Sequence, residues 1–184
     1  MNRYIDMIKF EIFNIAMLYQ TEHVSFRPDI IAYLVIIQDS QEKIPFDFSF
    51  YNVEVEVKKI PTADYTVKGF EDIVLVERKA SVDEIATNFT FKKDAWWREM
   101  KRMSEAKFKY VICEFPFQDV LDYPKSSKAS HKIKMNGIVI SQSINKCIAN
   151  YGVEFIFCDT KQQAENKTYE ILKDVHDNYE EVSF

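Results

Sequence analysis

The sequence predicts an α/β domain whose central β-sheet is mixed and flanked by helices. Short apolar and β-branched segments come first, and helical and strand-like segments then alternate, an order typical of such domains. The 184 residues are enough for one full hydrophobic core and too few for two ordinary domains. Apolar residues make up 47% of the chain and charged residues 29%, the usual mixture of a globular protein.

The first half of the chain predicts strands joined by turns. Residues 1–20 could form a helix, because isoleucines recur there three or four positions apart, but further apolar residues leave a strand open. A turn is expected at Lys68-Gly69. The strand-like segments are Ile30–Ile37, Val53–Val57, which alternates valine with glutamate, and Ile73–Val76.

The second half predicts helices alternating with strands. A helix is expected from Ser81, with Asp83 and Glu84 in its first turn, where the helix dipole favours acids. The stretch from Asp122 to Ser130 is expected to be a loop. The further elements are a helix over Lys93–Ala106, a strand over Tyr110–Cys113, a helix over Ser141–Asn150 that Gly152 ends, and a strand over Val153–Cys158.

A capping box opens the last predicted helix. Thr160 precedes Gln163 by three residues, the spacing at which the two side chains can bond each other's backbone N–H groups. The helical spacing that follows predicts a core face made of Ala164, Thr168, Ile171 and Val175.

Several classes of protein are disfavoured by the composition. The three scattered cysteines lack metal-ligand spacing, so we expect buried thiols in a reducing compartment and no zinc site. No apolar run reaches the roughly 18 residues of a membrane span, and the N-terminus lacks a signal-peptide cleavage site. We therefore expect a cytoplasmic protein with no membrane partner, or a nuclear one in a eukaryote.

Charge is unevenly distributed along the chain. The formal net charge of −5 argues mildly against a nucleic-acid partner, because phosphate binding needs cations. From Lys92 to Lys134, however, eleven basic residues face six acidic ones, whereas residues 154–184 contain eight acids and three lysines. A basic surface for nucleic acid and ordinary variation of surface charge both remain open.

Asp64, Glu77 and Lys79 form the minimal set of side chains for cutting a phosphodiester bond. A hard divalent cation held by carboxylates polarises the phosphate and lowers the pKa of a bound water, and a lysine can orient that water or offset developing charge. Asp64 opens one arm of a predicted hairpin, and Glu77 and Lys79 lie two residues apart on the return arm. Because residues two apart on a strand face the same side, the three side chains are expected to converge.

A longer pattern surrounds these residues. Ala63-Asp64 is followed by Glu77-Arg78-Lys79 and then by Asp83; upstream stand Asp39-Ser40-Gln41-Glu42 and Pro45-Phe46. This pattern resembles the XPF family of structure-selective endonucleases, whose signatures are D-x-R-E, then G-D, a variable gap and E-R-K-x-x-x-D. Residues 30–115 carry the resemblance, including the helix Arg98–Met103 and the strand Tyr110–Glu114, and residues 138–175 fit the family's closing elements more loosely.

The resemblance implies a fold and an activity. The fold would be restriction-endonuclease-like, a branch of the PD-(D/E)XK superfamily, with residues 1–184 as a single nuclease domain. Residues 1–28 would be an N-terminal extension and residues 30–175 the nuclease core, without a helix-hairpin-helix module. The activity would be Mg²⁺- or Mn²⁺-dependent endonucleolytic hydrolysis of DNA, selective for branched or flap structures.

The resemblance also implies roles for single residues. By position, Asp39, Asp64 and Glu77 would be metal ligands and Lys79 the catalytic lysine. Three further residues would support them. Glu42 would be a supporting acid, Arg78 a phosphate or structural contact, and Asp83 a partner that orients Arg78 or Lys79.

The chain departs from the family pattern at three positions. Ala63 stands in place of the usual glycine, which implies that the turn before Asp64 has an ordinary backbone conformation. Gln41 and Ala95 stand where arginines are common, and each removes a cation. No predicted ligand is lost, so catalysis is expected to survive.

The expected partner is DNA, branched or partly single-stranded, with a homodimer or another protein possible in addition. The helix after the active-site strand would follow the DNA backbone through Lys92, Lys93, Arg98, Lys101 and Arg102, although these could also form an ordinary solvated helix face. Trp96 and Trp97 are more typical of a core than of base stacking. Two alternatives remain: a catalytically silent DNA-binding or scaffold partner of another nuclease, and a nuclease that cuts RNA.

Overall fold

The computed structural model describes residues 33–127 and 135–179, which all belong to one compact unit, Tyr33–Phe184. The element predicted over residues 1–20, the N-terminal extension and the end of the loop predicted after Asp122 lie outside these residues. No helix of the described part combines the length and the apolar character that a bilayer crossing requires.

Six strands form one mixed sheet in the order β2-β1-β3-β4-β5-β6, which confirms the predicted α/β class. Strand β3 pairs antiparallel with β1 and with β4, and every other pair is parallel, so β3 runs against the other five. The strands are β1 Val35–Asp39, β2 Glu54–Lys58, β3 Tyr65–Val67, β4 Val74–Lys79, β5 Phe108–Cys113 and β6 Glu154–Phe157.

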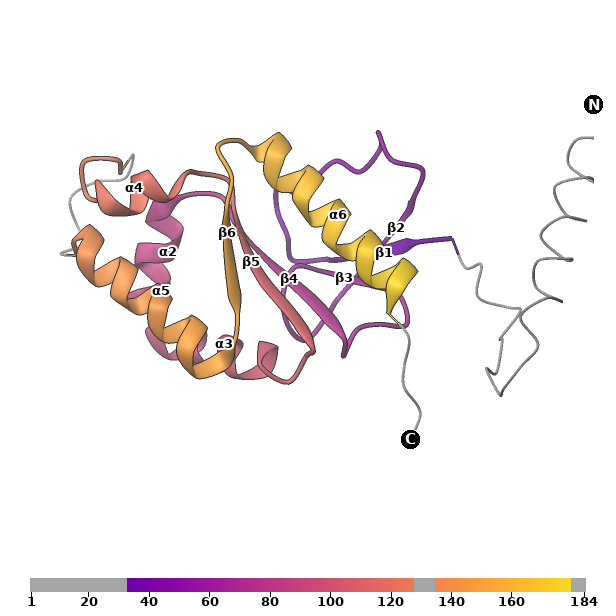
Figure 1. The fold of residues 1–184 in the computed structure, drawn as a ribbon, viewed down its shortest axis with the longest axis horizontal. Coiled ribbons are helices and arrows are strands. Elements are labelled where there is room, and N and C mark those ends of the chain that lie inside the picture. Colours follow the sequence, from indigo (N-terminus) through magenta and orange to yellow (C-terminus); the bar gives the residue numbers. More distant parts are fainter. Residues whose placement is uncertain (1–32, 128–134, 180–184) are drawn as a thin grey trace, which may run out of the picture. The chain divides into compact units, whose positions relative to one another are not determined.

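Helices cover both faces of the sheet (Figure 1). One face is covered by α2 (Val82–Phe89), α3 (Lys93–Met103) and α5 (Gly137–Tyr151), with the short α4 (Phe117–Leu121) packed against α5. The other face is covered by α6 (Lys161–Asn178), which lies across β3, β4 and β5.

Predicted end signals fix several of these helices. The hydroxyl of Ser81 accepts the N–H of Glu84 at 3.3 Å at the start of α2, and Thr160 accepts that of Gln163 at 3.2 Å at the start of α6. Gly152 ends α5 with a φ of 63°, a left-handed conformation that favours glycine. These helix ends are confirmed, as is the buried face of α6. In the predicted capping box, Gln163 Oε1 accepts the N–H of Asp159, one residue before Thr160, at 2.7 Å.

Helix α4 and the first turn of α5 were not predicted. Gly137 begins α5 against the backbone of α4, where an added Cβ would lie 2.3 Å from the carbonyl oxygen of Val120. This contact joins segments on either side of a long connection, and no local pattern in the sequence announces it.

The core has two parts, one on each side of the sheet, and β4 contributes to both. Leu75 packs among α2, α3 and α5, whereas Val74 and Val76 pack under α6. Alternation along the strand then places Glu77 and Lys79 on the α3 face and Arg78 on the α6 face. The three free cysteines are all buried in these cores, as predicted.

Candidate active site

Three acids lie in one row across neighbouring strands. Asp39 ends β1, Asp64 directly precedes β3, and Glu77 lies on β4. The pairing Gln38–Tyr65 sets Asp64 opposite Asp39, and the pairing Tyr65–Val76 leaves Asp64 close to Glu77. Backbone bonds continue the ladder: Asp39 N–H donates to the carbonyl of Asp64 at 2.8 Å, and Asp64 N–H to that of Val76 at 3.0 Å. Opposed residues of antiparallel strands share a face, with Cβ atoms about 5 Å apart.

The Asp64 carboxylate is held by the hairpin itself. Its Oδ2 accepts the backbone N–H of Arg78 at 2.7 Å. Burial raises the pKa of Asp64 to about 8, and the neighbouring Glu77 carboxylate adds to this rise, whereas the Lys79 ammonium opposes it. Asp64 and Glu77 are thus two poorly solvated carboxyl groups that share one neighbouring positive charge, the Lys79 ammonium.

Lys79 lies at the centre of this acidic group. Its Nζ is 2.6 Å from Glu77 Oε1 and 3.2 Å from Glu84 Oε1, and it lies 5.1 Å from the centre of the Trp96 ring. Burial lowers the pKa of Lys79, but Glu77, Glu84 and Asp64 together outweigh this effect and raise it. Lys79 is thus a buried, protonated ammonium that faces the acids.

The carboxylates fit a divalent cation by their chemistry, since hard oxygen donors are the ligands that such ions prefer. They are not gathered around one point: Asp39 Oδ1 accepts the N–H of Ile60 at 3.3 Å, and Glu77 pairs with Lys79. Within residues 33–127 and 135–179, no three acidic, histidine or cysteine side chains are grouped to hold a metal.

Arg78 and Glu42 lie on the opposite face of the sheet. The side chain of Arg78 is 6% exposed, with Nε 2.6 Å from Glu114 Oε1 and Nη1 3.1 Å from Glu42 Oε1. Its guanidinium also lies 5.3 Å from the centre of the Phe46 ring. Of the two roles expected for Arg78, the structural one fits this geometry, and Glu42 contacts Arg78 rather than the acids of the α3 face.

Comparison with known proteins identifies the family of the chain. The model of the ERCC4 domain family matches residues 38–171, a span that contains the row of acids, Lys79 and all of α3. The chain belongs to the ERCC4 domain family. No curated protein matches the sequence at a significant level.

Two solved structures resemble this ERCC4 domain. One is XPF from Aeropyrum pernix, with a TM-score of 0.56, 17% identity, and 75% of this chain and 64% of the other covered. The second is XPF from Aeropyrum pernix in complex with DNA, with a TM-score of 0.58, 15% identity, and 81% and 68% covered. The chain therefore spans about two thirds of each, and at these identities the likeness concerns the fold. Together with the family match, it confirms the predicted resemblance to the XPF family and its fold.

The turn before Asp64 corrects one expectation. Ala63 has a φ of 66°, whereas its alanine was expected to indicate an ordinary backbone conformation. It is the one non-glycine residue with a positive φ in the described part of the ERCC4 domain. The turn keeps the left-handed shape that a glycine would adopt without cost, because contacts from α3 hold it.

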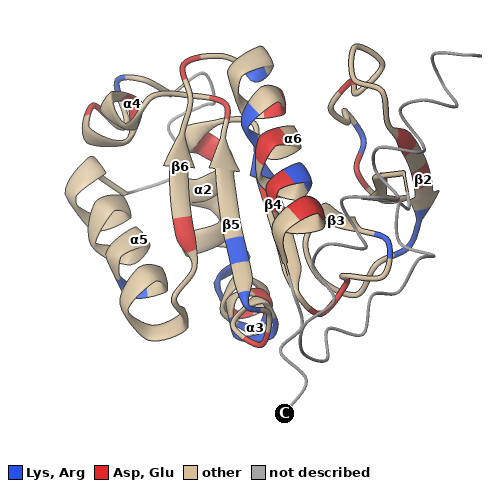
Figure 2. Cartoon of the chain, turned by 45° about the vertical axis from the view of Figure 1, so that its right-hand side comes forward, with Lys and Arg blue, Asp and Glu red and all other residues tan. Residues whose placement is uncertain are grey.

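The remaining predicted residues are placed as follows. Asp83 accepts a hydrogen bond from the Ser127 hydroxyl, and the acid that contacts Lys79 from α2 is Glu84, one residue later. The five basic residues predicted to bind DNA are exposed on or just before α3, where Figure 2 shows basic segments in blue. Arg102 differs from the others because its Nε donates to Thr62 Oγ1 at 2.9 Å.

Sequence reasoning missed two acids beside the site, Glu84 and Glu99. Glu84 was read only as an acid favoured by the helix dipole. Glu99 Oε1 accepts the N–H of Ala63 at 2.9 Å, and its charge helps to raise the pKa of Glu77. A signal existed for Glu99: it directly precedes Met100, on the flank of the apolar stripe of α3 that faces the sheet.

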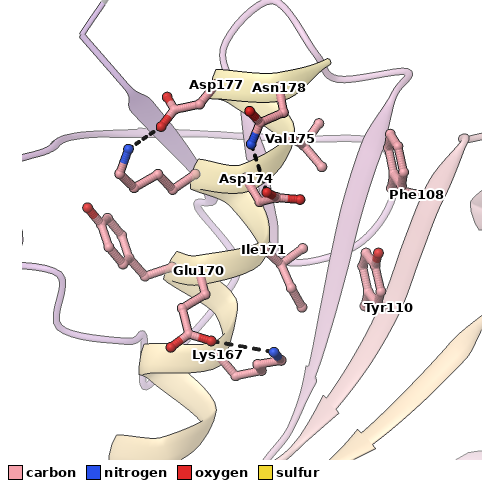
Figure 3. A pocket seen from close by; sticks show the side chains of 11 residues that line it. Phe108, Tyr110, Lys167, Glu170, Ile171, Asp174, Val175, Asp177 and Asn178 are labelled. Carbon is pink, nitrogen blue, oxygen red and sulfur yellow. Dashed lines mark hydrogen bonds and ion pairs between the residues drawn. The ribbon is translucent and has the colours of Figure 1, made fainter.

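A cavity of about 500 Å³ lies far from these residues in the fold, between α6 and β5. Figure 3 shows Phe108 and Tyr110 of β5 across from Ile171 and Asp174 of α6. None of the predicted site residues lines it, so the candidate active site lies at the strand ends under α3 instead.

Proposed function

We propose that this ERCC4 domain is an endonuclease that hydrolyses DNA phosphodiester bonds with a bound Mg²⁺ or Mn²⁺. The proposal is carried by Asp64 and Glu77, which are neighbouring acids at the β3–β4 hairpin with the Lys79 ammonium beside them. The raised pKa of both carboxyl groups, caused first by burial and then by neighbouring acids, supports a cation site, because a divalent ion would favour their charged forms.

Each residue would then have a distinct task. Asp64 and Glu77 would hold the cation, with Asp39 as the next donor in the same row. The bound cation would supply the charge that polarises the phosphate and lowers the pKa of a water molecule. Lys79 would offset the negative charge that develops on the phosphate, and its second partner, Glu84, would keep the ammonium in place while Glu77 serves the cation.

The proposed substrate is DNA, branched or carrying a flap. Support comes from the exposed basic residues of α3, among which Arg98 and Lys101 are three apart and so share one side of the helix. Support also comes from the similar fold of XPF in complex with DNA. We also propose that a second copy of the chain or a partner protein contributes to selectivity for branched DNA.

A cleavage assay tests the proposal. Supercoiled, linear, flap and junction DNA would be incubated with the native chain in Mg²⁺ or Mn²⁺, beside Asp64→Asn, Glu77→Gln and Lys79→Met. Asp174→Asn is the matched control, because Asp174 is an exposed acid on the opposite face. Cleavage by the native chain and the control, with a loss of about 100-fold or more in the three variants, is expected.

The main alternative is a catalytically silent DNA-binding or scaffold partner of another nuclease. It is favoured by the lack, among the described residues, of three side chains already grouped to hold a cation. Binding of flap DNA without cleavage in either metal would support this alternative. RNA substrates of the same shape, run in parallel, distinguish a DNA nuclease from an RNA nuclease.

A further inference from the structure

The backbone before Asp64 adopts an unfavourable conformation. Ala63 has a φ of 66°, and a left-handed conformation costs a residue with a Cβ about 1–2 kcal/mol. Ala63 is buried, so water cannot serve its backbone N–H. Something in the structure must hold this residue in place.

Helix α3 holds the turn at two consecutive residues. Glu99 Oε1 accepts the Ala63 N–H at 2.9 Å, and Arg102 Nε donates to Thr62 Oγ1 at 2.9 Å. The two helix residues also pair with each other, through Arg102 Nη2 and Glu99 Oε2. A single turn of α3 is thereby hydrogen-bonded to Thr62 and Ala63, the two residues that precede Asp64.

The two oxygens of Glu99 both have partners in this arrangement. Oε1 is bonded to Ala63 and Oε2 to Arg102, and the side chain is 19% exposed. A carboxylate so engaged is suited to fixing the backbone rather than to binding a cation. Its charge nevertheless helps to raise the pKa of Glu77, so the residue lies near that acid.

We propose that Glu99 is a positioning residue that locks the turn at Thr62 and Ala63 and so aims the Asp64 carboxylate toward Glu77. The proposal rests on the proposed function in one respect: it assumes that Asp64 and Glu77 bind a divalent cation. Glu99 acts through the hydrogen bond that it accepts and not through its negative charge.

The proposal is tested by Mn²⁺ binding to the full chain, measured by calorimetry. Glu99→Ala removes the acceptor for Ala63 and should weaken Mn²⁺ binding about tenfold or more, as loss of a residue that orients a ligand does. Glu99→Gln keeps an acceptor oxygen without the charge and should stay within about threefold of the native affinity. Asp94→Ala, an exposed acid of the same helix, is the matched control and should bind as the native chain does.

A double variant separates positioning from general stability. Glycine adopts the left-handed conformation without strain. Adding Ala63→Gly to Glu99→Ala should therefore recover at least half of the lost Mn²⁺ affinity, measured on a logarithmic scale. Circular dichroism confirms that each variant is folded. Equal damage by Glu99→Gln and Glu99→Ala, native affinity in Glu99→Ala, or no recovery by Ala63→Gly would each overturn the proposal.

Two measurements distinguish failure of the proposed function from failure of the positioning role of Glu99. If the native chain and Asp64→Asn bind Mn²⁺ equally, the metal site does not exist. The hold on the turn is then measured by amide hydrogen exchange at Ala63. Protection kept in Glu99→Gln and lost in Glu99→Ala supports the positioning role, and equal exchange in both refutes it.

Discussion

The backbone N–H of Arg78 donates to Oδ2 of Asp64 across the β3–β4 hairpin, at 2.7 Å. This bond fixes the carboxylate near Glu77, on a face where burial and that second acid raise the pKa of Asp64 to about 8. An acid in such a place lowers stability when it ionises. Candidate function and folding free energy are therefore opposed at this residue.

Asp64→Asn should stabilise the protein, increasingly so at higher pH, when metal is removed with EDTA. The folded-state pKa of Asp64, about 8, lies above its ordinary value of 3.8, so the folded protein binds this proton more tightly than the unfolded chain. The stabilisation is fully present below the ordinary value and is lost as pH rises through about 8. Asparagine keeps an oxygen for the Arg78 N–H and does not titrate.

Urea unfolding at pH 6 and pH 9 measures this effect. The free energy of unfolding of Asp64→Asn relative to the native chain should rise by about 1 kcal/mol or more between the two pH values. Asp174→Asn, on the exposed side of α6, should show no such rise. A difference that does not vary with pH would contradict the raised pKa.

Mn²⁺ or Mg²⁺ should restore the folding stability that is lost when Asp64 ionises. A cation that binds only the folded state stabilises it by about 2.7 kcal/mol at one hundred times its dissociation constant, or roughly 5 °C or more in Tm for a chain of this size. The shift should be large at pH 8, smaller at pH 6, where Asp64 is protonated, and absent in Asp64→Asn and Glu77→Gln. Differential scanning fluorimetry with and without metal measures it, and an equal shift in Glu77→Gln would show that the cation binds elsewhere.

Arg78→Met should destabilise the protein by about 3–5 kcal/mol, because it leaves the buried carboxylates of Glu42 and Glu114 without their shared partner. Arg78→Met combined with Glu114→Gln should recover part of this loss. Urea unfolding measures both variants. A stable Arg78→Met that has lost DNA affinity would instead assign Arg78 to the phosphate backbone.

Gly137→Ala should destabilise the protein by about 1–3 kcal/mol, the usual cost of overpacking. The new Cβ would lie 2.3 Å from a carbonyl oxygen of α4, and a backbone atom cannot rotate away as a side chain would. Asn145→Ala, at an exposed position of α5, is the control and should leave stability unchanged or higher. Equal unfolding midpoints for the two variants would show that α4 is free to move aside.

Local signals account for the parts of the fold that could be predicted. Ser81, Gly152 and Thr160 each fix a helix end through bonds within a few residues, so the sequence alone locates them. Glu77 and Lys79 could be placed on one face because strand alternation is equally local.

The missed features depend on contacts between distant segments. Ala63 adopts its left-handed conformation because Glu99 accepts its N–H, and the residue itself gives no sign of this. Glu99 meets Ala63 only once α3 has packed over the turn before β3, and Glu114 meets Arg78 only once β5 has paired with β4. The family resemblance named the acids of the strands and one helix residue, Asp83, but neither Glu84 nor Glu99.

The side chains of three consecutive residues of β4 lie on opposite faces of the sheet: Arg78 on the α6 face, and Glu77 and Lys79 on the α3 face. A shift of this strand by a single position would therefore exchange the layers, turning the guanidinium toward the row of acids and sending both Glu77 and Lys79 under α6. Loops of new length grafted between Val67 and Val74 should thus be tolerated only when they preserve this pairing. For protein engineering, strand alignment is the parameter that such a graft has to conserve.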